Sequence, residues 1–266
     1  MSIQTVHAGA LEYLAAGNIP VPHGFTTRLG GVSTGDFGAM NLAVRPGETP
    51  ENVRKNHEIL ASALGFDPDM LVLTHQTHSD RVRQVTAADC LGADHHAYPP
   101  CDSLITDTDG LALMIFTADC TPILLYDPVT GAVGAAHAGW RGTAADIAGK
   151  TAAAMAESFG SRPADLCAAI GPNISECCFQ TDGDVPQAMR AAFGQEAEKW
   201  IRPDGEKYYV NLKALNALAL RRAGVVNIQI STACTACQPA RFWSHRVHGA
   251  SRGSQGAVIV CRRGKA

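Results

Sequence analysis

Three segments of the chain bring a short apolar run next to a side chain that can bind a metal ion. One run leads into His75 and His78, a second ends just before Cys120, and a third ends at His137. Thiolate and imidazole groups favour Zn²⁺ or copper over Mg²⁺ and Ca²⁺, and a catalytic zinc site uses about three protein ligands with one open position. These residue types suit a metal centre mounted on rigid strand ends. They equally suit a buried cysteine beside two hydrogen-bonded histidines.

The spacing of these residues does not distinguish the two interpretations. The chain has no HExxH motif, and its one CxxC motif, Cys234 to Cys237, has no second pair at the spacing that a structural zinc site normally shows. Most of the nine cysteines are therefore interpreted as small hydrophobic residues. Disulfide bonds are not expected, because a chain of 266 residues folds without cross-links in a reducing compartment.

Apolar runs and amphipathic segments predict the strands and helices that position these side chains. A helix is predicted to begin at Thr49 and Pro50, which suit an N-cap and a first helical position, and to end at Gly65. Further helices are predicted over residues 146–159, 185–193 and 211–223. Strands are predicted over residues 70–73, 103–106, 111–117, 122–127, 132–137, 166–170, 227–230 and 257–260.

This mixture of elements predicts an α/β (mixed α+β) fold with layered, mixed β-sheets flanked by helices. The order of elements is not a regular βαβ series, so neither a Rossmann fold nor a TIM barrel is expected. No internal repeat or long linker interrupts the chain, and we expect one domain over residues 1–266. Residues 92–101 are typical of a surface loop, in which His95 and His96 are interpreted as solvated.

The composition excludes several classes of protein. Hydrophobic residues make up 46% and charged residues 18% of the chain, which is enough apolar side chain for a substantial core. The net charge is −3 and the basic residues are scattered, which argues against a nucleic-acid groove or a membrane-surface patch. The longest apolar run, residues 111–116, is too short to span a bilayer. Residues 1–5 show no secretory signal, so we expect a cytoplasmic protein.

Six strings between residue 23 and about residue 179 occur in an order that resembles one known family. They are HGFTTRLGGVS, NLAVRPGETPENVRKN, LTHQTHSDRV, CDSLITDTDGLALMIFTADCTPILLYDP, GAVGAAHAGWRGTAADI and AAIGPNISECCF. Together with CTAC and FWSHR near the end, they resemble the successive motifs of the YfiH (laccase-domain-containing) family. The pairing of ADC-TP with HAGWRG is the most specific of these features.

The resemblance implies a single-domain fold of mixed sheets layered with helices, of the kind shared by YfiH and cytotoxic necrotizing factor. It also implies a metal site built from the histidine of a Q-x-H motif, the cysteine of ADC and the histidine of HAGWRG. In this sequence these residues are His78, Cys120 and His137. His75 is the alternative for the first position, and the implied metal is Zn²⁺, with copper possible.

The activity that the resemblance implies is phosphorolysis of purine nucleosides (adenosine, inosine, guanosine and methylthioadenosine), with adenosine deaminase activity. The expected partners are a purine nucleoside and phosphate, and the expected state is a monomer or weak homo-oligomer. Arg28, beside the flexible pair Gly30-Gly31, is the first candidate for the phosphate ligand, with Arg141 and Arg246 as alternatives. The H-x-E and P-C-x-x-C signature of conventional zinc deaminases is absent from the sequence.

Other functions stay open at this point. A copper-dependent polyphenol oxidase is the activity behind the laccase label, but one His/Cys/His set provides too few ligands for its several copper centres. A cysteine hydrolase that edits peptidoglycan precursors would use Cys120 as nucleophile and His137 as base. A metal-buffering protein without catalytic activity is a further class.

Several residues near the motifs have two interpretations each. Asp119 either orients a ligand histidine or caps a turn, and Asp102 is a weaker candidate for the first role. Trp140 either stacks on a purine or belongs to the core. The adjacent pair Cys177 and Cys178 is interpreted as packing near the site. Towards the end of the chain, the segments Ser-His-Arg-Val at 244–247 and Ser-Arg-Gly at 251–253 depart from the family pattern, which leaves their substrate contacts open.

Overall fold

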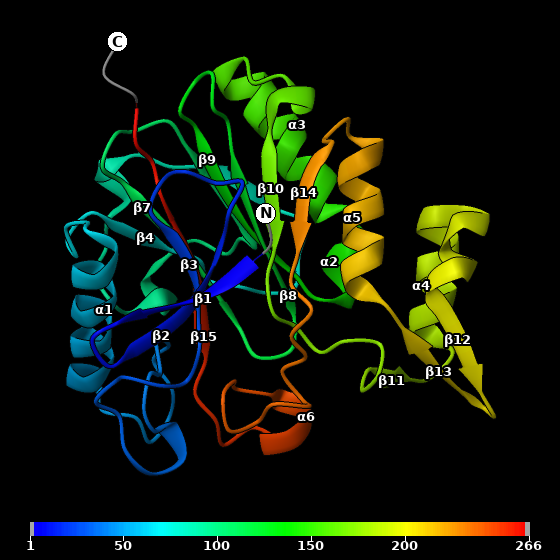
Figure 1. Ribbon diagram of the computed structural model, residues 1–266, viewed down its shortest axis with the longest axis horizontal. Coiled ribbons are helices and arrows are strands. Elements are labelled where there is room, and N and C mark those ends of the chain that lie inside the picture. Colours follow the sequence, from blue (N-terminus) through cyan, green and yellow to red (C-terminus); the bar gives the residue numbers. More distant parts are fainter. Residues whose placement is uncertain (1–2, 264–266) are drawn as a thin grey trace.

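Two six-stranded β-sheets and one small three-stranded sheet form the frame of the protein in the computed structural model, which describes residues 3–263 (Figure 1). The first sheet has the strand order β1-β2-β3-β15-β7-β4. All its neighbouring pairs are antiparallel except β4 with β7. Its strands are β1 (Ile3–Ala8), β2 (Leu11–Ala16), β3 (His23–Thr26), β15 (Gln255–Val260), β7 (Ala112–Thr117) and β4 (Leu71–Leu73).

The second sheet has the order β14-β10-β8-β9-β6-β5 and is antiparallel in its centre, with one parallel pair at each edge. Its strands are β14 (Asn227–Ile230), β10 (Cys167–Ile170), β8 (Thr121–Tyr126), β9 (Val133–Ala138), β6 (Ser103–Thr106) and β5 (Val82–Gln84). The small sheet, in the order β11-β13-β12, contains β11 (Gln180–Thr181), β13 (Lys207–Val210) and β12 (Ile201–Asp204).

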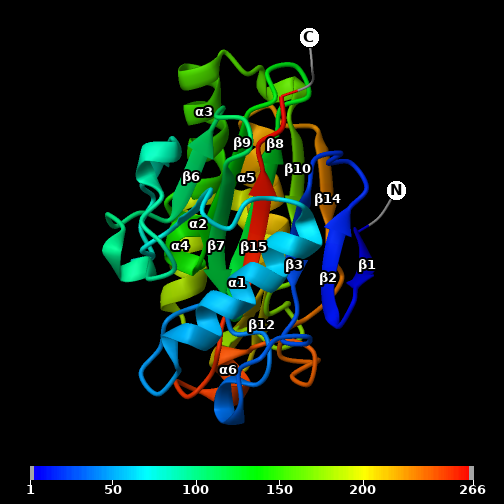
Figure 2. The same ribbon diagram turned by 90° about the vertical axis from the view of Figure 1, so that its left-hand side faces the viewer.

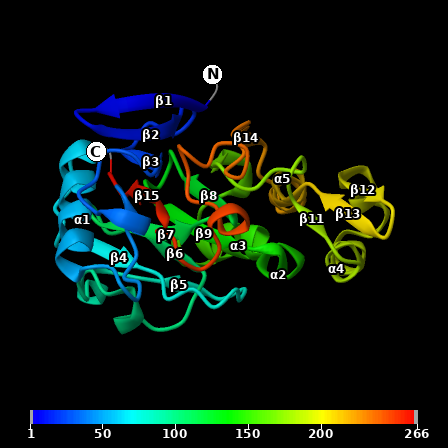
Figure 3. The same cartoon turned by 90° about the horizontal axis from the view of Figure 1, so that it is seen from below.

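Helices cover the outer faces of the two sheets (Figures 1 and 2). The α-helices are α1 (Pro50–Leu64), α2 (Trp140–Ala144), α3 (Ile147–Phe159), α4 (Asp184–Phe193), α5 (Leu212–Arg222) and α6 (His245–His248). Short 3₁₀ turns occupy Gly35–Phe37, Ala87–Asp89, His95–Ala97, Pro163–Asp165 and Gly194–Trp200. Seen from below, α1 lies on the side of the first sheet, and α3 and α5 lie on the side of the second sheet (Figure 3). Within residues 3–263, no helix is long and apolar enough to cross a membrane.

Two hydrophobic clusters hold these layers together. The first joins the first sheet to the inner face of the second, where Met114 and Val258 belong to the same cluster as Leu124 and Ala135. The second cluster lies between the other face of the second sheet and its helices, and includes Ile123. The strands β7, β8, β9 and β15 are buried along their whole length, which explains why they read as continuous apolar runs rather than as alternating patterns.

The predicted fold class is therefore confirmed, and most predicted elements occur within one or two residues of their expected bounds. Helix α1 begins at Pro50 and ends before Gly65, whose φ of 68° is the left-handed conformation of a helix C-cap. The strands β1, β2, β3, β5, β11, β12 and β13 were not predicted, because each either is irregular in exposure or has at most four residues. One domain over residues 1–266 stays a prediction.

The chain passes from the first sheet to the second at two places that concern function. One crossover joins β4 to β5, and the other joins β7 to β8 through residues 118–120. His78 lies in the first crossover and Cys120 in the second. The strand β9 is paired with β8 so that His137 lies opposite Pro122. Both crossovers and the end of β9 therefore meet at one edge of the sheet sandwich.

Candidate metal centre and active-site pocket

His78, Cys120 and His137 converge at this edge. The sulfur of Cys120 lies 3.8 Å from Nε2 of His78, and the two imidazole rings are 5.0 Å apart between centroids. One donor atom from each of the three residues lies within 4.8 Å of the other two. Two imidazoles and one thiolate, with room for a fourth ligand, form a donor set that fits a catalytic Zn²⁺ ion. The role of the three residues as metal ligands stays a prediction.

His75, the alternative ligand, has a different environment. Its Nδ1 lies 3.2 Å from the carbonyl oxygen of Tyr98, and its ring packs edge-on against His96. The intervening Gln76 anchors the loop, because its amide donates to the carbonyl of Phe116 at 2.8 Å and accepts from the amide of the same residue at 2.6 Å. The geometry thus favours His78, the residue of the Q-x-H position, over His75.

The backbone of the site adopts conformations that few residues tolerate. His78 has a φ of 59° and Asp119 a φ of 93°, both in the left-handed region that non-glycine residues avoid. Gly139, directly after β9, provides space for the site. A Cβ atom at this position would lie 2.7 Å from Cδ2 of His78 and 3.3 Å from the sulfur of Cys120. The glycine of the HAGWRG string is therefore required for the close approach of His78 and Cys120 to the end of β9.

Asp102 forms hydrogen bonds with both histidines. This fully buried carboxylate accepts a 2.8 Å hydrogen bond from Nδ1 of His137 and a 3.0 Å bond from the backbone amide of His78. Its other oxygen accepts from the amides of Thr77 and Ser79 and from the Ser79 hydroxyl. Because Nδ1 of His137 is bound to Asp102, Nε2 is the atom that faces Cys120, which is the usual support for a histidine ligand.

Asp102, the weaker candidate in the sequence, thus makes the hydrogen bonds expected of a residue that orients these histidines. Asp119 instead accepts a 2.6 Å hydrogen bond from the hydroxyl of Thr235 and a 2.7 Å bond from the backbone amide of Arg246. Through these two bonds Asp119, the neighbour of Cys120, holds the segments that contain Thr235 and Arg246.

Without a metal ion, Cys120 and His137 form a charged pair. Burial alone raises the pKa of the Cys120 thiol, but the charge of His137 and hydrogen bonds from His137 and His78 outweigh it and lower the pKa to about 6. Burial alone lowers the pKa of His137, but the charge of Cys120 and the bond to Asp102 raise it to about 9. Both shifts describe one interaction, a thiolate beside an imidazolium. A metal ion held by both groups would require the imidazolium to lose its proton.

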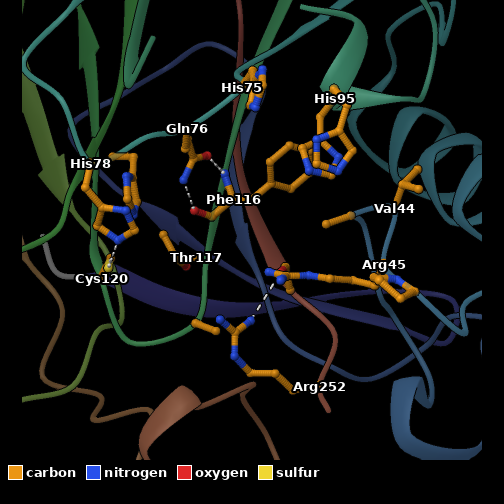
Figure 4. A pocket seen from close by; sticks show the side chains of 16 residues that line it. Val44, Arg45, His75, Gln76, His78, His95, Phe116, Thr117, Cys120 and Arg252 are labelled. Atoms are coloured by element: carbon orange, nitrogen blue, oxygen red, sulfur yellow. Dashed lines mark hydrogen bonds between the residues drawn. The ribbon is translucent and has the colours of Figure 1, made fainter. Parts of the chain in front are cut away.

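A cavity of about 460 Å³ opens beside the three residues, a size that suits a small-molecule ligand. Figure 4 shows His78 and Cys120 on one side of it and Arg45 and Arg252 on another, with Phe116 between them. The complete lining is Ala43, Val44, Arg45, Pro46, His75, Gln76, His78, His95, His96, Phe116, Thr117, Ala118, Cys120, His137, Arg252 and Ser254.

Two arginines give this cavity a strong positive charge. Arg45 donates to the hydroxyl of Ser254 at 2.9 Å, and Arg252 approaches the same hydroxyl at 3.4 Å. Burial, followed by the charge of Arg45, lowers the pKa of Arg252 to about 10. Among residues 3–263, the Nε atoms of both side chains are buried and have no hydrogen-bond partner. Two guanidinium groups that converge without a carboxylate between them form a site suited to an anion.

A second cavity of about 320 Å³ is also lined by Cys120. It shares His78, Ala118, Cys120 and Arg252 with the first cavity, and its other lining residues are Asp119, Ile174, Phe179, His245 and Arg246. Arg246 is held by the carbonyl groups of Cys178 and Gln180 at 2.8 and 2.9 Å. The divergent segments near the end of the chain therefore do line the site.

Arg28, the first candidate for the phosphate ligand, lies outside both cavities. Its guanidinium donates to the carbonyl groups of Gly38 and Pro239 and stacks on Trp243, with 3.8 Å from Cζ to the ring centre. Arg28 is thereby satisfied by the protein itself. Arg141, one of the two alternatives, is exposed and stacks on Trp140, and it is not among the residues that line these two cavities.

Sequence reasoning missed the residues that complete the pocket. Arg45 lies within one of the family strings, but nothing in its spacing connects it with Arg252, more than two hundred residues away. His95, interpreted as solvated, lines the cavity beside Phe116, at 5.1 Å between ring centroids. Burial first, and then the charge of His96, lowers its pKa to about 4.

Comparison with known proteins agrees with the motifs. The purine nucleoside phosphorylase of Deinococcus radiodurans is 37% identical over 252 residues, which cover 95% of this chain and 94% of that protein. The purine nucleoside phosphorylase YlmD of Bacillus subtilis is 37% identical over 234 residues, or 86% of this chain and 84% of that protein.

Solved structures match the whole fold. The hypothetical protein YfiH of Bacillus licheniformis superposes with a TM-score of 0.91 at 33% identity, covering 98% of this chain and 99% of that chain. YlmD of Geobacillus stearothermophilus superposes with a TM-score of 0.90 at 35% identity, with the same coverage. The family model described as multi-copper polyphenol oxidoreductase laccase matches residues 22–262. The chain belongs to this laccase-like family, which is the one that its motifs predicted.

Proposed function

We propose that this protein cleaves purine nucleosides with phosphate, and that His78, Cys120 and His137 hold a Zn²⁺ ion in its active site. The observation that carries the proposal is the pair Arg45 and Arg252, whose guanidinium groups converge in the cavity beside the His/Cys/His set. A nucleoside phosphorylase must bind phosphate next to a nucleoside, and this cavity combines an anion site with space for a small molecule. The names of the relatives from D. radiodurans and B. subtilis support the same reaction.

In the proposed reaction, Arg45 and Arg252 bind and orient phosphate through their free N–H groups. A phosphate oxygen forms a bond to C1′ of the ribose while the bond from C1′ to N9 of the purine breaks. The purine leaves with the electron pair of that bond and is released as the free base after N9 gains a proton. The other product is ribose 1-phosphate.

The remaining residues position the groups around this reaction. A Zn²⁺ ion on the three ligands would supply a Lewis acid beside the substrate. Asp102 holds the Nδ1 proton of His137, so that Nε2 stays directed at the cavity. Phe116 and His95 present ring faces and edges on which a purine can pack.

The test is phosphate-dependent release of adenine from adenosine by the purified protein, with bound metal measured in the same sample. Wild type is compared with Cys120→Ala and Arg252→Ala, and Arg54→Ala, on the exposed side of α1, is the matched control. We expect adenine release that requires phosphate, falls at least tenfold in both site variants and is unchanged in the control. Full zinc loading without turnover of adenosine, inosine, guanosine or methylthioadenosine would refute the proposal.

The same samples test the deaminase activity that the family resemblance implies. Ammonia release from adenosine in the absence of phosphate measures this reaction separately from adenine release. Copper instead of zinc in the metal analysis, with oxygen-dependent turnover of a phenol, would support the polyphenol oxidase alternative.

A cysteine hydrolase is favoured by one specific observation, the chain of contacts from Cys120 through His137 to Asp102. A thiolate, an imidazole and a carboxylate in this order form the arrangement of a nucleophile, its base and an orienting group. If this is the function, metal-free protein is the active form and zinc inhibits it. Turnover of peptidoglycan-precursor amides that rises when zinc is removed would support the hydrolase. Nucleoside turnover that is lost when zinc is removed would support the phosphorylase.

A further inference from the structure

Four cysteines meet at a second place, away from the His/Cys/His set. Cys177 and Cys178 lie between β10 and β11, and Cys234 and Cys237 lie in the segment that follows β14. The sulfur of Cys237 is 3.5 Å from that of Cys177 and 3.3 Å from that of Cys178. All four sulfur atoms lie within 4.8 Å of one another. The CxxC motif thus has a partner pair, which is an adjacent Cys-Cys rather than a second CxxC.

The separations distinguish a metal site from cross-linked cysteines. A tetrahedral zinc ion with four thiolates at about 2.3 Å requires sulfur atoms about 3.8 Å apart, and three of the separations in the cluster are 3.3, 3.5 and 3.8 Å. All nine cysteines of the chain are free thiols, and a disulfide would need sulfur atoms at about 2 Å. The four side chains are therefore arranged around a common centre.

We propose that Cys177, Cys178, Cys234 and Cys237 bind a Zn²⁺ ion as a closed tetrathiolate site. Four thiolates select a soft d¹⁰ cation such as Zn²⁺ over Mg²⁺, Ca²⁺ or Mn²⁺. All four tetrahedral positions are filled by the protein, so the site has no position for water or substrate and its role is structural. It is thereby distinct in chemistry from the open site of the three other ligands.

The surroundings of the cluster suit the negative charge of such a centre. The ammonium group of Lys213 is buried against it, with Nζ 3.0 Å from the Ser175 hydroxyl and 2.7 Å from the carbonyl oxygen of Ala233. The backbone amide of Ser175 donates to the sulfur of Cys234 at 3.3 Å. Glu176, the nearest acid in sequence, accepts a 2.9 Å hydrogen bond from the side-chain amide of Asn211. A buried cation and an N–H donor to sulfur offset the net charge of −2 that four thiolates leave on Zn²⁺.

A metal ion here would fasten two segments that form one side of the active site. The segments already touch through a bridge between Asn173 and Cys234 and through the amide of Thr235, which donates to the carbonyl of Asn173 at 3.0 Å. Thr235 also holds Asp119, the neighbour of Cys120. The proposed zinc ion would hold in place the side of the second cavity that includes Arg246, and it would not contact substrate.

Metal counting tests this proposal independently of catalysis. The protein is purified under reducing conditions, saturated with Zn²⁺, freed of unbound metal and analysed for zinc per chain. We expect two Zn²⁺ ions in wild type and one each in Cys120→Ala and Cys237→Ser. Cys120→Ala/Cys237→Ser should bind none. Cys90→Ser, a half-buried cysteine outside both clusters, is the control and should keep two.

The ligands of the second ion are read from the Cys120→Ala variant, in which X-ray absorption should show only sulfur at about 2.3 Å. If Cys237→Ser does not fold by circular dichroism, Cys177→Ser replaces it, because Cys177 is equally exposed. Unchanged zinc content in the folded variant would overturn the proposal. The proposal would also be overturned if protein that was reduced and then exposed to zinc had an intact mass two hydrogens below that of the reduced chain, with a disulfide mapped among the four cysteines. Neither result depends on whether nucleosides are substrates.

Discussion

Replacement of Asp102 by Asn tests whether the buried carboxylate positions the metal ligands. Asn keeps the shape of the side chain but replaces one acceptor oxygen by an NH₂ donor. One oxygen of Asp102 accepts from His137 and His78, and the other from Thr77 and Ser79. In either orientation of the amide, its NH₂ group therefore faces N–H donors and at least two hydrogen bonds are lost.

The expected magnitude follows from these contacts. Loss of the group that supports a metal-bound histidine weakens metal affinity about 10- to 100-fold, which is about 1.4–2.7 kcal/mol. Donors left buried without an acceptor cost a further ~1–3 kcal/mol each in folding stability. Since Asp102 is fully buried, solvent does not replace the lost acceptor. Asp102→Asn should therefore lower zinc affinity and the melting temperature together.

The assay is competition for Zn²⁺ with a chromophoric chelator, combined with thermal unfolding of the metal-free protein. Asp127→Asn is the matched control, because Asp127 is also fully buried and accepts from Val129 and Thr130 in a turn beyond β8. The control should lose stability but keep its zinc affinity. A folded Asp102→Asn variant with zinc affinity within twofold of wild type would show that Asp102 does not position the ligands.

Three further outcomes are expected. Gly139→Ala should abolish zinc binding at the His/Cys/His set, because its Cβ would lie 2.7 Å from His78, whereas Gly183→Ala, with no atom within 4 Å of the added Cβ, should bind normally in the same competition assay. Arg45→Ala should raise the KM for phosphate at least tenfold with little change in the KM for nucleoside; equal effects on both would contradict an anion site. Burial lowers the pKa of His57 to about 4 from 6.5, so its contribution to stability is complete above about pH 6.5 and is lost as the pH falls towards 4. The loss is at most about 3 kcal/mol, and urea unfolding of His57→Gln should show a smaller loss over this range.

The prediction for His57 rests on a buried contact in α1. Its Nε2 lies 2.8 Å from the carbonyl oxygen of Leu42, in the segment that leads to Arg45. A protonated imidazole has no compensating negative charge in this contact, so the unfolded chain binds the proton more tightly. Parallel pH profiles for wild type and His57→Gln would contradict this explanation.

The central strands of the two large sheets were predictable from sequence, because burial on both faces makes each of them a continuous apolar run. This holds for β7, β8 and β9, and it also located the ends at which Cys120 and His137 lie. β1 was not predictable, because it forms the edge of its sheet and its residues are mostly half-buried or exposed. β5 has only three residues, none of them buried.

The candidate site was predictable only as far as local motifs reach. His78, Cys120 and His137 each lie in a string that resembles the YfiH family, and that resemblance implied their convergence. Arg45 and Arg252 come from opposite ends of the chain, and only tertiary structure brings them to Ser254. For the same reason the pairing of Cys177-Cys178 with the CxxC motif was missed, because it depends on a contact between two loops.

The position of β15 has a consequence for the order in which the protein is made. β15 lies between β3 and β7, is buried along its length and pairs with both neighbours. The amide of Gly256 also donates to the hydroxyl of Thr26, 230 residues earlier in the chain. A nascent chain on the ribosome therefore has two halves of the first sheet that cannot join until β15 emerges. Until that moment the edges of β3 and β7 are open to pairing with other chains.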